Sequence, residues 1–150
     1  MPRQVAAAAR WLFPAYLLVL AVVVFLPAAE ADRFTGVVGW LALQVGRLGV
    51  PVDSAYLVLE FTANVVLFLP FGLLAAMAYP RLRPVAVVVL GSASSVVIEL
   101  VQLTIPSRYA TVSDVIANTI GAALGWLIFA AVSRGTARSA QSSAEASGAA

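Results

Sequence analysis

Four stretches of this chain are long and apolar enough to cross a lipid bilayer, and no other feature restricts its fold as strongly. A transmembrane helix needs about 20 predominantly apolar residues. Residues 11–28, 55–79, 84–105 and 112–132 each meet that requirement. Hydrophobic residues make up 62% of the chain and charged residues only 11%, so no polar stretch is long enough for a separate soluble domain. We therefore predict an all-α fold, a polytopic membrane helix bundle of four transmembrane helices embedded in the lipid bilayer.

A short segment between the first two spans has a different pattern. Residues 34–48 are apolar but too short to cross comfortably, and they include three glycines and Arg47. At about 100° per residue, the side opposite the glycines and Arg47 is apolar. That side carries Phe34, Val37, Val38, Leu41, Val45 and Leu48. We predict an amphipathic segment that lies on the membrane surface.

The end of the first span has a second interpretation. The sequence Pro27-Ala28-Ala29-Glu30-Ala31 contains the Ala-x-Ala pattern typical of a signal-peptide cleavage site. The apolar run before it is longer than the roughly 7–15 residues of a signal-peptide core. We therefore expect this segment to remain in the protein as a transmembrane helix.

The composition excludes several kinds of chemistry. The chain has no cysteine and no histidine, which excludes disulfides and thiolate nucleophiles and removes the commonest general base and zinc ligand. Its net charge is only +2 and its arginines are scattered, so no nucleic-acid-binding surface is predicted. No cofactor is predicted either. Any chemistry must use carboxylates, arginine, tyrosine, serine or amides.

The arginines predict how the chain is oriented, because short cytoplasmic loops collect basic residues. With the N-terminus inside, the cytoplasmic arginines are Arg3, Arg10, Arg81, Arg83, Arg134 and Arg138. The outer loops then hold Arg33, Arg47 and Arg108, diluted by nearby acids. We predict a multi-pass protein of the cell membrane with both termini cytoplasmic. It consists of an N-terminus at residues 1–10, a membrane domain at 11–133, and a Ser/Ala/Gly-rich tail at 134–150 that is predicted to be disordered.

The carboxylates and amides inside the last three spans all fall near the predicted outer ends of those spans. They are Glu60, Asn64, Glu99, Gln102, Asp114 and Asn118, with Arg108 in the outer loop between the last two spans. On each of the last two spans, polar and small residues share one stripe. The stripe of the span at 84–105 contains Gly91, Ser95, Glu99 and Gln102, and that of the span at 112–132 contains Asp114, Asn118, Gly121 and Gly125. Small residues let helix backbones approach, and Gly-x-x-x-Gly is a usual spacing for that contact. We therefore expect these polar side chains to face into the bundle and form one ligand-binding site.

Charge inside a bilayer is expensive, at about 2.5–3.5 kcal/mol per group, and this marks such residues as functional candidates. Glu60, Glu99 and Asp114 bring three negative charges against one candidate partner, Arg108. The excess charge has three explanations: a protonated carboxyl group, a bound cation, or a water-filled cavity open to the outside. Calcium or magnesium would suit these oxygens, but no spacing here is diagnostic of either ion, and no metal site is predicted.

The same residues have purely structural interpretations. Thr111-x-x-Asp114 has the pattern of a capping box at the start of a helix. Arg108 could be a solvated charge. Interhelical hydrogen bonding, worth about 0.6 kcal/mol each, would explain the amides Asn64, Gln102 and Asn118. Glu99 lies inside an apolar helix, where no capping role is expected.

Polar motifs run in order from Glu60-x-x-x-Asn64 and Pro70-Phe71-Gly72, through Ile98-Glu99 and Gln102, to Ser107-Arg108 and Asp114-x-x-x-Asn118-x-x-Gly121. These motifs resemble those of the VanZ-like family of small bacterial membrane proteins. The resemblance covers residues 60–125, and the family's polar motif corresponds here to Asn64, Glu99, Gln102, Arg108, Asp114 and Asn118. It implies a role in the cell envelope, because the family is associated with low-level resistance to teicoplanin-type glycopeptide antibiotics. It supplies no reaction.

Three functions remain open from the sequence. The first is a binding or catalytic site for an envelope lipid, a lipid-linked glycan or a glycopeptide-related ligand, with Arg108 holding a phosphate or carboxylate and Glu99 or Asp114 as general acid or base. The second is a proton-coupled carrier, against which no acidic or basic residue is predicted in the inner half of any span. The third is a structural or partner-binding protein whose polar stripe fixes helix packing. Whether the protein is an enzyme, and whether it self-associates, stays open.

Overall fold

The computed structural model describes residues 3–25, 28–105 and 111–148, and this part of the chain forms five α-helices and no strand. They are α1 (Arg3–Phe25), α2 (Ala28–Gly46), α3 (Val52–Ala78), α4 (Pro84–Gln102) and α5 (Val112–Gly148). Four helices are long and apolar enough to cross a membrane, over Gln4–Phe25, Val52–Ala78, Pro84–Gln102 and Val112–Thr136. The predicted all-α membrane fold with four spanning helices is confirmed.

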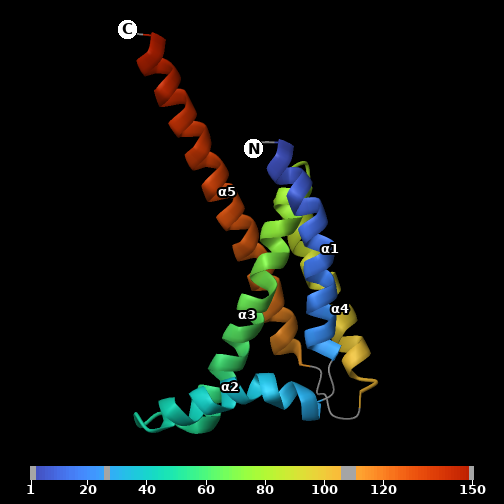
Figure 1. Ribbon diagram of the computed structural model, residues 1–150. Helices are drawn as coiled ribbons and strands as arrows, with labels where there is room; N and C mark the ends of the chain where they lie inside the picture. Colours follow the sequence, from blue (N-terminus) through green and yellow to red (C-terminus); the bar gives the residue numbers. More distant parts are fainter. Residues whose placement is uncertain (1–2, 26–27, 106–110, 149–150) are drawn as a thin grey trace.

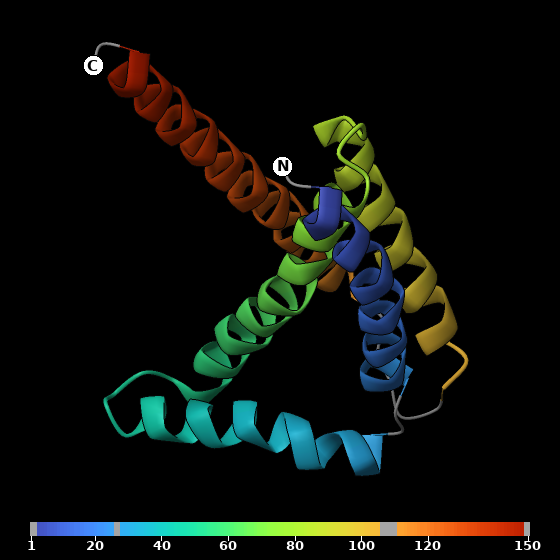
Figure 2. The same cartoon turned by 45° about the horizontal axis from the view of Figure 1, so that its top comes forward.

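The four spanning helices run alternately up and down, and α2 lies across one end of them (Figure 1). At this end, which we call the α2 end, α1 and α4 finish and α3 and α5 begin. Figure 2 shows α2 spanning the base between the end of α1 and the start of α3. The start of α1, the end of α5 and the turn between α3 and α4 lie away from the α2 end (Figure 1).

Helices α3 and α5 touch through their backbones at glycines. A side chain on Gly121 would overlap the backbone carbonyl of Val65. A side chain on Gly125 would overlap the backbone carbonyl of Leu69. From the α3 side, a side chain on Gly72 would overlap the backbone carbonyl of Ala122. Small residues permit this close contact, which is the main source of helix association when the solvent is lipid. The contact predicted for Gly121-x-x-x-Gly125 is confirmed, and α3 is its partner.

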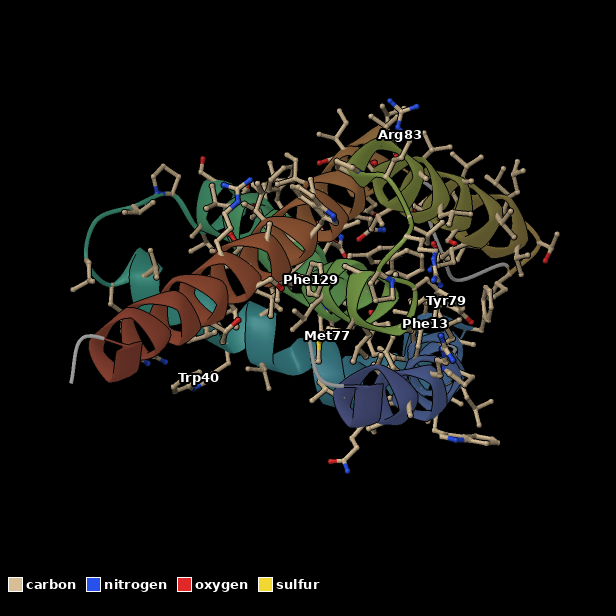
Figure 3. All side chains as sticks on the ribbon, turned by 90° about the horizontal axis from the view of Figure 1, so that it is seen from above. Phe13, Trp40, Met77, Tyr79, Arg83 and Phe129 are labelled. Carbon is tan, nitrogen blue, oxygen red and sulfur yellow. The ribbon has the colours of Figure 1, made fainter. Side chains whose placement is uncertain are left out.

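Helix α1 packs on α3 through large apolar side chains. Leu20 and Val24 of α1 belong to one buried cluster with Phe68 and Phe71 of α3. At the other end of this contact, Phe13 meets Tyr79 edge to face, with ring centroids 6.4 Å apart (Figure 3). Between these two points the Tyr16 hydroxyl donates to the backbone carbonyl of Leu67, so one hydrogen bond adds to the apolar contact of α1 with α3.

The first span begins earlier than predicted, since α1 starts at Arg3 instead of residue 11. Residues 6–9 are alanines, the strongest helix formers. The guanidinium Nε of Arg10 donates to the carbonyl of Ala78, 3.1 Å away, at the last turn of α3. Carbonyls in that turn have no partner within their own helix. Arg10 therefore stays in an apolar helix because it caps the end of another one.

Smaller differences affect three other boundaries. Ala28, predicted as the end of the first span, is the first residue of α2, which starts before the predicted residue 34. Val52, predicted to belong to a break, starts α3 directly after Pro51. Helix α4 ends at Gln102 instead of residue 105. The possible cleavage sequence at residues 27–31 includes Pro27, which is outside the described residues.

The largest difference follows residue 132. The tail predicted to be disordered from residue 134 is helical in the structure, because α5 continues to Gly148. Its composition cannot bury a core, and that was the basis of the prediction. A helix extension, however, needs no new nucleus when a spanning helix already precedes it. Alanine, arginine and glutamine in this segment also favour the helical state.

Helix α2 includes most of the segment that the sequence predicts to be amphipathic. Ala42 is fully buried, whereas Val37, Trp40 and Leu41 face outward from the protein. Trp40 lies at the periphery of the molecule in Figure 3. A large apolar side chain that no part of the protein covers suits the boundary between lipid tails and headgroups, where tryptophan is enriched.

Candidate functional site

The polar stripe of α4 is buried along its whole length, as predicted. The buried positions of this helix are Val87, Gly91, Ser95, Glu99 and Gln102, which all lie on one side. The opposite side carries valines and leucines that face outward. A charged or amide group on the buried side therefore meets protein and not lipid.

On α5 the predicted stripe is confirmed as well. Asn118, Gly121 and Gly125 are buried, and Asp114 is partly buried. The Asp114 amide N–H donates to the hydroxyl oxygen of Thr111, 3.1 Å away, so Thr111 caps the start of this helix. Thr111 therefore has the capping role that the sequence Thr111-x-x-Asp114 predicts.

The Asp114 side chain, however, takes part in a contact with α3. Its Oδ1 accepts a hydrogen bond from Nδ2 of Asn64 at 2.7 Å. In a capping box, the third residue of the helix would reach back to the N–H of the capping residue. Asp114 instead joins α5 to α3.

Glu99 of α4 supplies the missing half of the capping box. Its Oε2 accepts a hydrogen bond from the backbone N–H of Thr111 at 2.8 Å. This corrects the expectation that Glu99 has no capping role, because it caps a helix other than its own. The start of α5 also carries a partial positive charge from its aligned peptide dipoles, which favours a carboxylate there.

The structure brings four of the predicted site residues together at the α2 end. Glu60 and Asp114 line the same pocket, and Asn64 bonds to Asp114. Glu99 accepts the N–H of Thr111, the residue whose hydroxyl accepts the N–H of Asp114. We call Glu60, Asn64, Glu99 and Asp114 the polar cluster. Its members come from α3, α4 and α5. Among the described residues, no group of three or more carboxylates stands close enough to hold a metal ion.

One helical turn deeper, α4 and α5 continue to meet through polar side chains. Asn118 Nδ2 donates to Ser95 Oγ at 2.8 Å, and the hydroxyls of Ser92 and Thr119 lie 2.9 Å apart. Asn118 is only 4% exposed, yet its Oδ1 has no partner in the structure. Exchanging the amide's oxygen and nitrogen would only transfer the unmet bond to the nitrogen. We call these four residues the polar seam.

Gln102, another predicted site residue, bonds to a different helix. Gln102 Nε2 donates to the carbonyl of Val24 at 2.9 Å, so it joins α4 to the last turn of α1. This contact caps α1 and fits the interhelical interpretation of the amides. Arg108 lies outside the described residues.

A pocket of about 370 Å³ lies between α3 and α5 beside the polar cluster. Its lining residues are Leu57, Val58, Glu60, Phe61, Thr62, Thr111, Ser113 and Asp114. Below their crossing, α3 and α5 diverge toward the α2 end (Figure 1). The pocket occupies this divergence, with an apolar wall on α3 and polar groups from both helices. The sequence could not locate it, because its walls come from segments about 50 residues apart.

These features define a multi-pass membrane protein with one buried and two partly buried acids near one end of its spanning helices. A family model described as VanZ/LLP1 matches residues 13–133, and the chain belongs to this family. The match covers α3, α4 and the polar cluster completely, and it includes the spanning part of α1 from residue 13 and that of α5 up to residue 133. Comparison with curated proteins found no match, and comparison with solved structures found none either.

Proposed function

We propose that the polar cluster binds the headgroup of a cell-envelope amphiphile: an envelope lipid, a lipid-linked glycan or a glycopeptide-related molecule. The observation that carries this proposal is that Glu60 and Asp114 line one pocket, while Glu99 of a third helix bonds to Thr111, another residue of the pocket lining. Acids buried at bilayer depth persist when they serve a function, because each is costly to insert. Glu99 and Asp114 are also the candidates for a general acid or base if the ligand reacts.

The proposed site opens on the outer side of the cell membrane. This orientation follows from the arginines, since Arg10, Arg81, Arg83 and Arg134 all lie away from the α2 end. Both chain termini are then cytoplasmic, and α2 lies in the outer interface. An outward-facing site for an envelope molecule agrees with the antibiotic-resistance association of the VanZ family.

A structural role is the second candidate, and specific hydrogen bonds favour it for the amides. Asn64, Gln102 and Asn118 each join two helices through their side chains. These residues are proposed to fix helix register, whereas the three carboxylates carry the binding function. A proton-coupled carrier has less support. The polar seam ends at Ser92 and Thr119, and the adjacent contact between α4 and α5 is the apolar one of Gly91 with Ala122, which cannot pass a proton.

Changing the carboxylates to amides separates the two roles. Glu99→Gln and Asp114→Asn each keep an oxygen that can accept the bond from Thr111 or Asn64 but remove the charge. We expect normal folded abundance in the membrane and loss of the envelope phenotype, measured as glycopeptide susceptibility, to the level of cells without the protein. Abundance that falls together with the phenotype would favour the structural role. Parental susceptibility in both variants would contradict the proposal.

A further inference from the structure

We infer that the pocket between α3 and α5 admits, from the side, a phospholipid whose headgroup carries a protonated amine. This inference rests on the proposed function and specifies the chemistry of its ligand. It starts from the two unlike halves of the pocket. One half consists of Leu57, Val58 and Phe61 on α3, and the other contains the carboxylates of Glu60 and Asp114.

The apolar half of the pocket is open toward the lipid. Leu57 and Val58 are 65% and 66% exposed, and both belong to a membrane-spanning helix. Their side chains therefore contact acyl chains when nothing else is bound. A lipid can approach along this wall without leaving the bilayer, whereas a water-soluble ligand would have to displace lipid first.

The polar half selects the sign of the headgroup charge. Glu60 and Asp114 line it together with the hydroxyl-bearing residues Thr62, Thr111 and Ser113, and no described lining residue is basic. The Glu60 and Asp114 carboxylates repel each other. A primary ammonium offers three N–H donors and one positive charge, which suits two acids with hydroxyl groups beside them. An anionic headgroup such as glycerol phosphate would add to the repulsion. The pocket volume of about 370 Å³ suits a small headgroup and the start of its chains.

Lipid retention by the purified full-length protein tests the inference. The probes are phosphatidylethanolamine, phosphatidylglycerol and N-acetylated phosphatidylethanolamine with identical acyl chains, compared by native mass spectrometry. The parent protein should retain phosphatidylethanolamine about tenfold better than either of the others. Equal retention of the three lipids overturns the inference, and this arm needs no variant that could fail to fold.

A pair of variants locates the selectivity. Glu60→Gln should lower retention of phosphatidylethanolamine about tenfold. Asp53→Asn is the matched control, since Asp53 lies in the first turn of the same helix and does not line the pocket. An equal effect of both variants, or of neither, contradicts the inference. If lipid selectivity is absent but Glu99→Gln still abolishes the phenotype, only the lipid class is wrong. If selectivity is present and the phenotype persists, the proposed function is wrong.

Discussion

Replacing Gly125 with leucine is expected to eliminate most of the folded protein. A side chain at this position would overlap the carbonyl of Leu69 and the amide nitrogen of Leu73, which are backbone atoms of α3. Backbone atoms inside a helix cannot move aside as a flexible side chain can, so the two helices must separate. Overpacking a side-chain contact typically costs about 1–3 kcal/mol, and this backbone contact should cost at least that much.

Gly135→Leu is the matched control for this experiment. Gly135 belongs to the same helix, in the last turn of its spanning stretch, and nothing lies within 4 Å of where its side chain would begin. The measurement is the folded, monodisperse fraction recovered from membranes in mild detergent. The variant at position 125 should be strongly depleted, and the variant at 135 should match the parent. Equal recovery of both variants would show that α3 and α5 do not cross at this glycine.

Replacing Ser95 with leucine should have the second-largest effect on stability. Ser95 is fully buried and accepts the hydrogen bond from Asn118. Leucine would overpack the contact between α4 and α5 and leave the Asn118 amide with both ends unmet. Together, overpacking and an unpaired buried amide should lower the free energy of unfolding by about 2–4 kcal/mol.

The control for Ser95→Leu is Ala93→Leu, at an exposed position of the same helix. Leucine favours helix nearly as well as alanine, and at an outward-facing position it meets lipid. Stability is measured by titrating the protein in mild detergent micelles with a denaturing detergent while recording helix content. The first variant should unfold at a clearly lower denaturant fraction than the second. Coincident curves would mean that the polar seam is not packed as the structure shows.

Periodicity and small residues were enough to predict which faces of the helices are buried. The stripes on α4 and α5 could be predicted because a helix repeats every 3.6 residues and because glycine marks close backbone contact. Those two rules are local to one helix. They place Glu99 and Asn118 correctly on inward-facing sides.

Contacts between different helices could not be predicted in the same way. Glu99 caps α5 and Arg10 caps α3, and neither role is visible in the sequence around the residue itself. Each cap satisfies a backbone group that its own helix leaves unpaired. The partner is fixed only when the helices pack. The extension of α5 to Gly148 was missed for another reason, since a composition that excludes a core does not exclude a helix.

The account depends most on the polar cluster facing the outside of the cell, and cysteine labelling tests this directly. The chain contains no cysteine, so a single substitution gives a single reactive site. Ser113 is exposed and lines the pocket, and Arg83 is exposed in the turn between α3 and α4 (Figure 3). In intact cells, a membrane-impermeant maleimide should label Ser113→Cys and should label Arg83→Cys only after permeabilisation. The reverse pattern would place the cluster on the cytoplasmic side and contradict the proposed function.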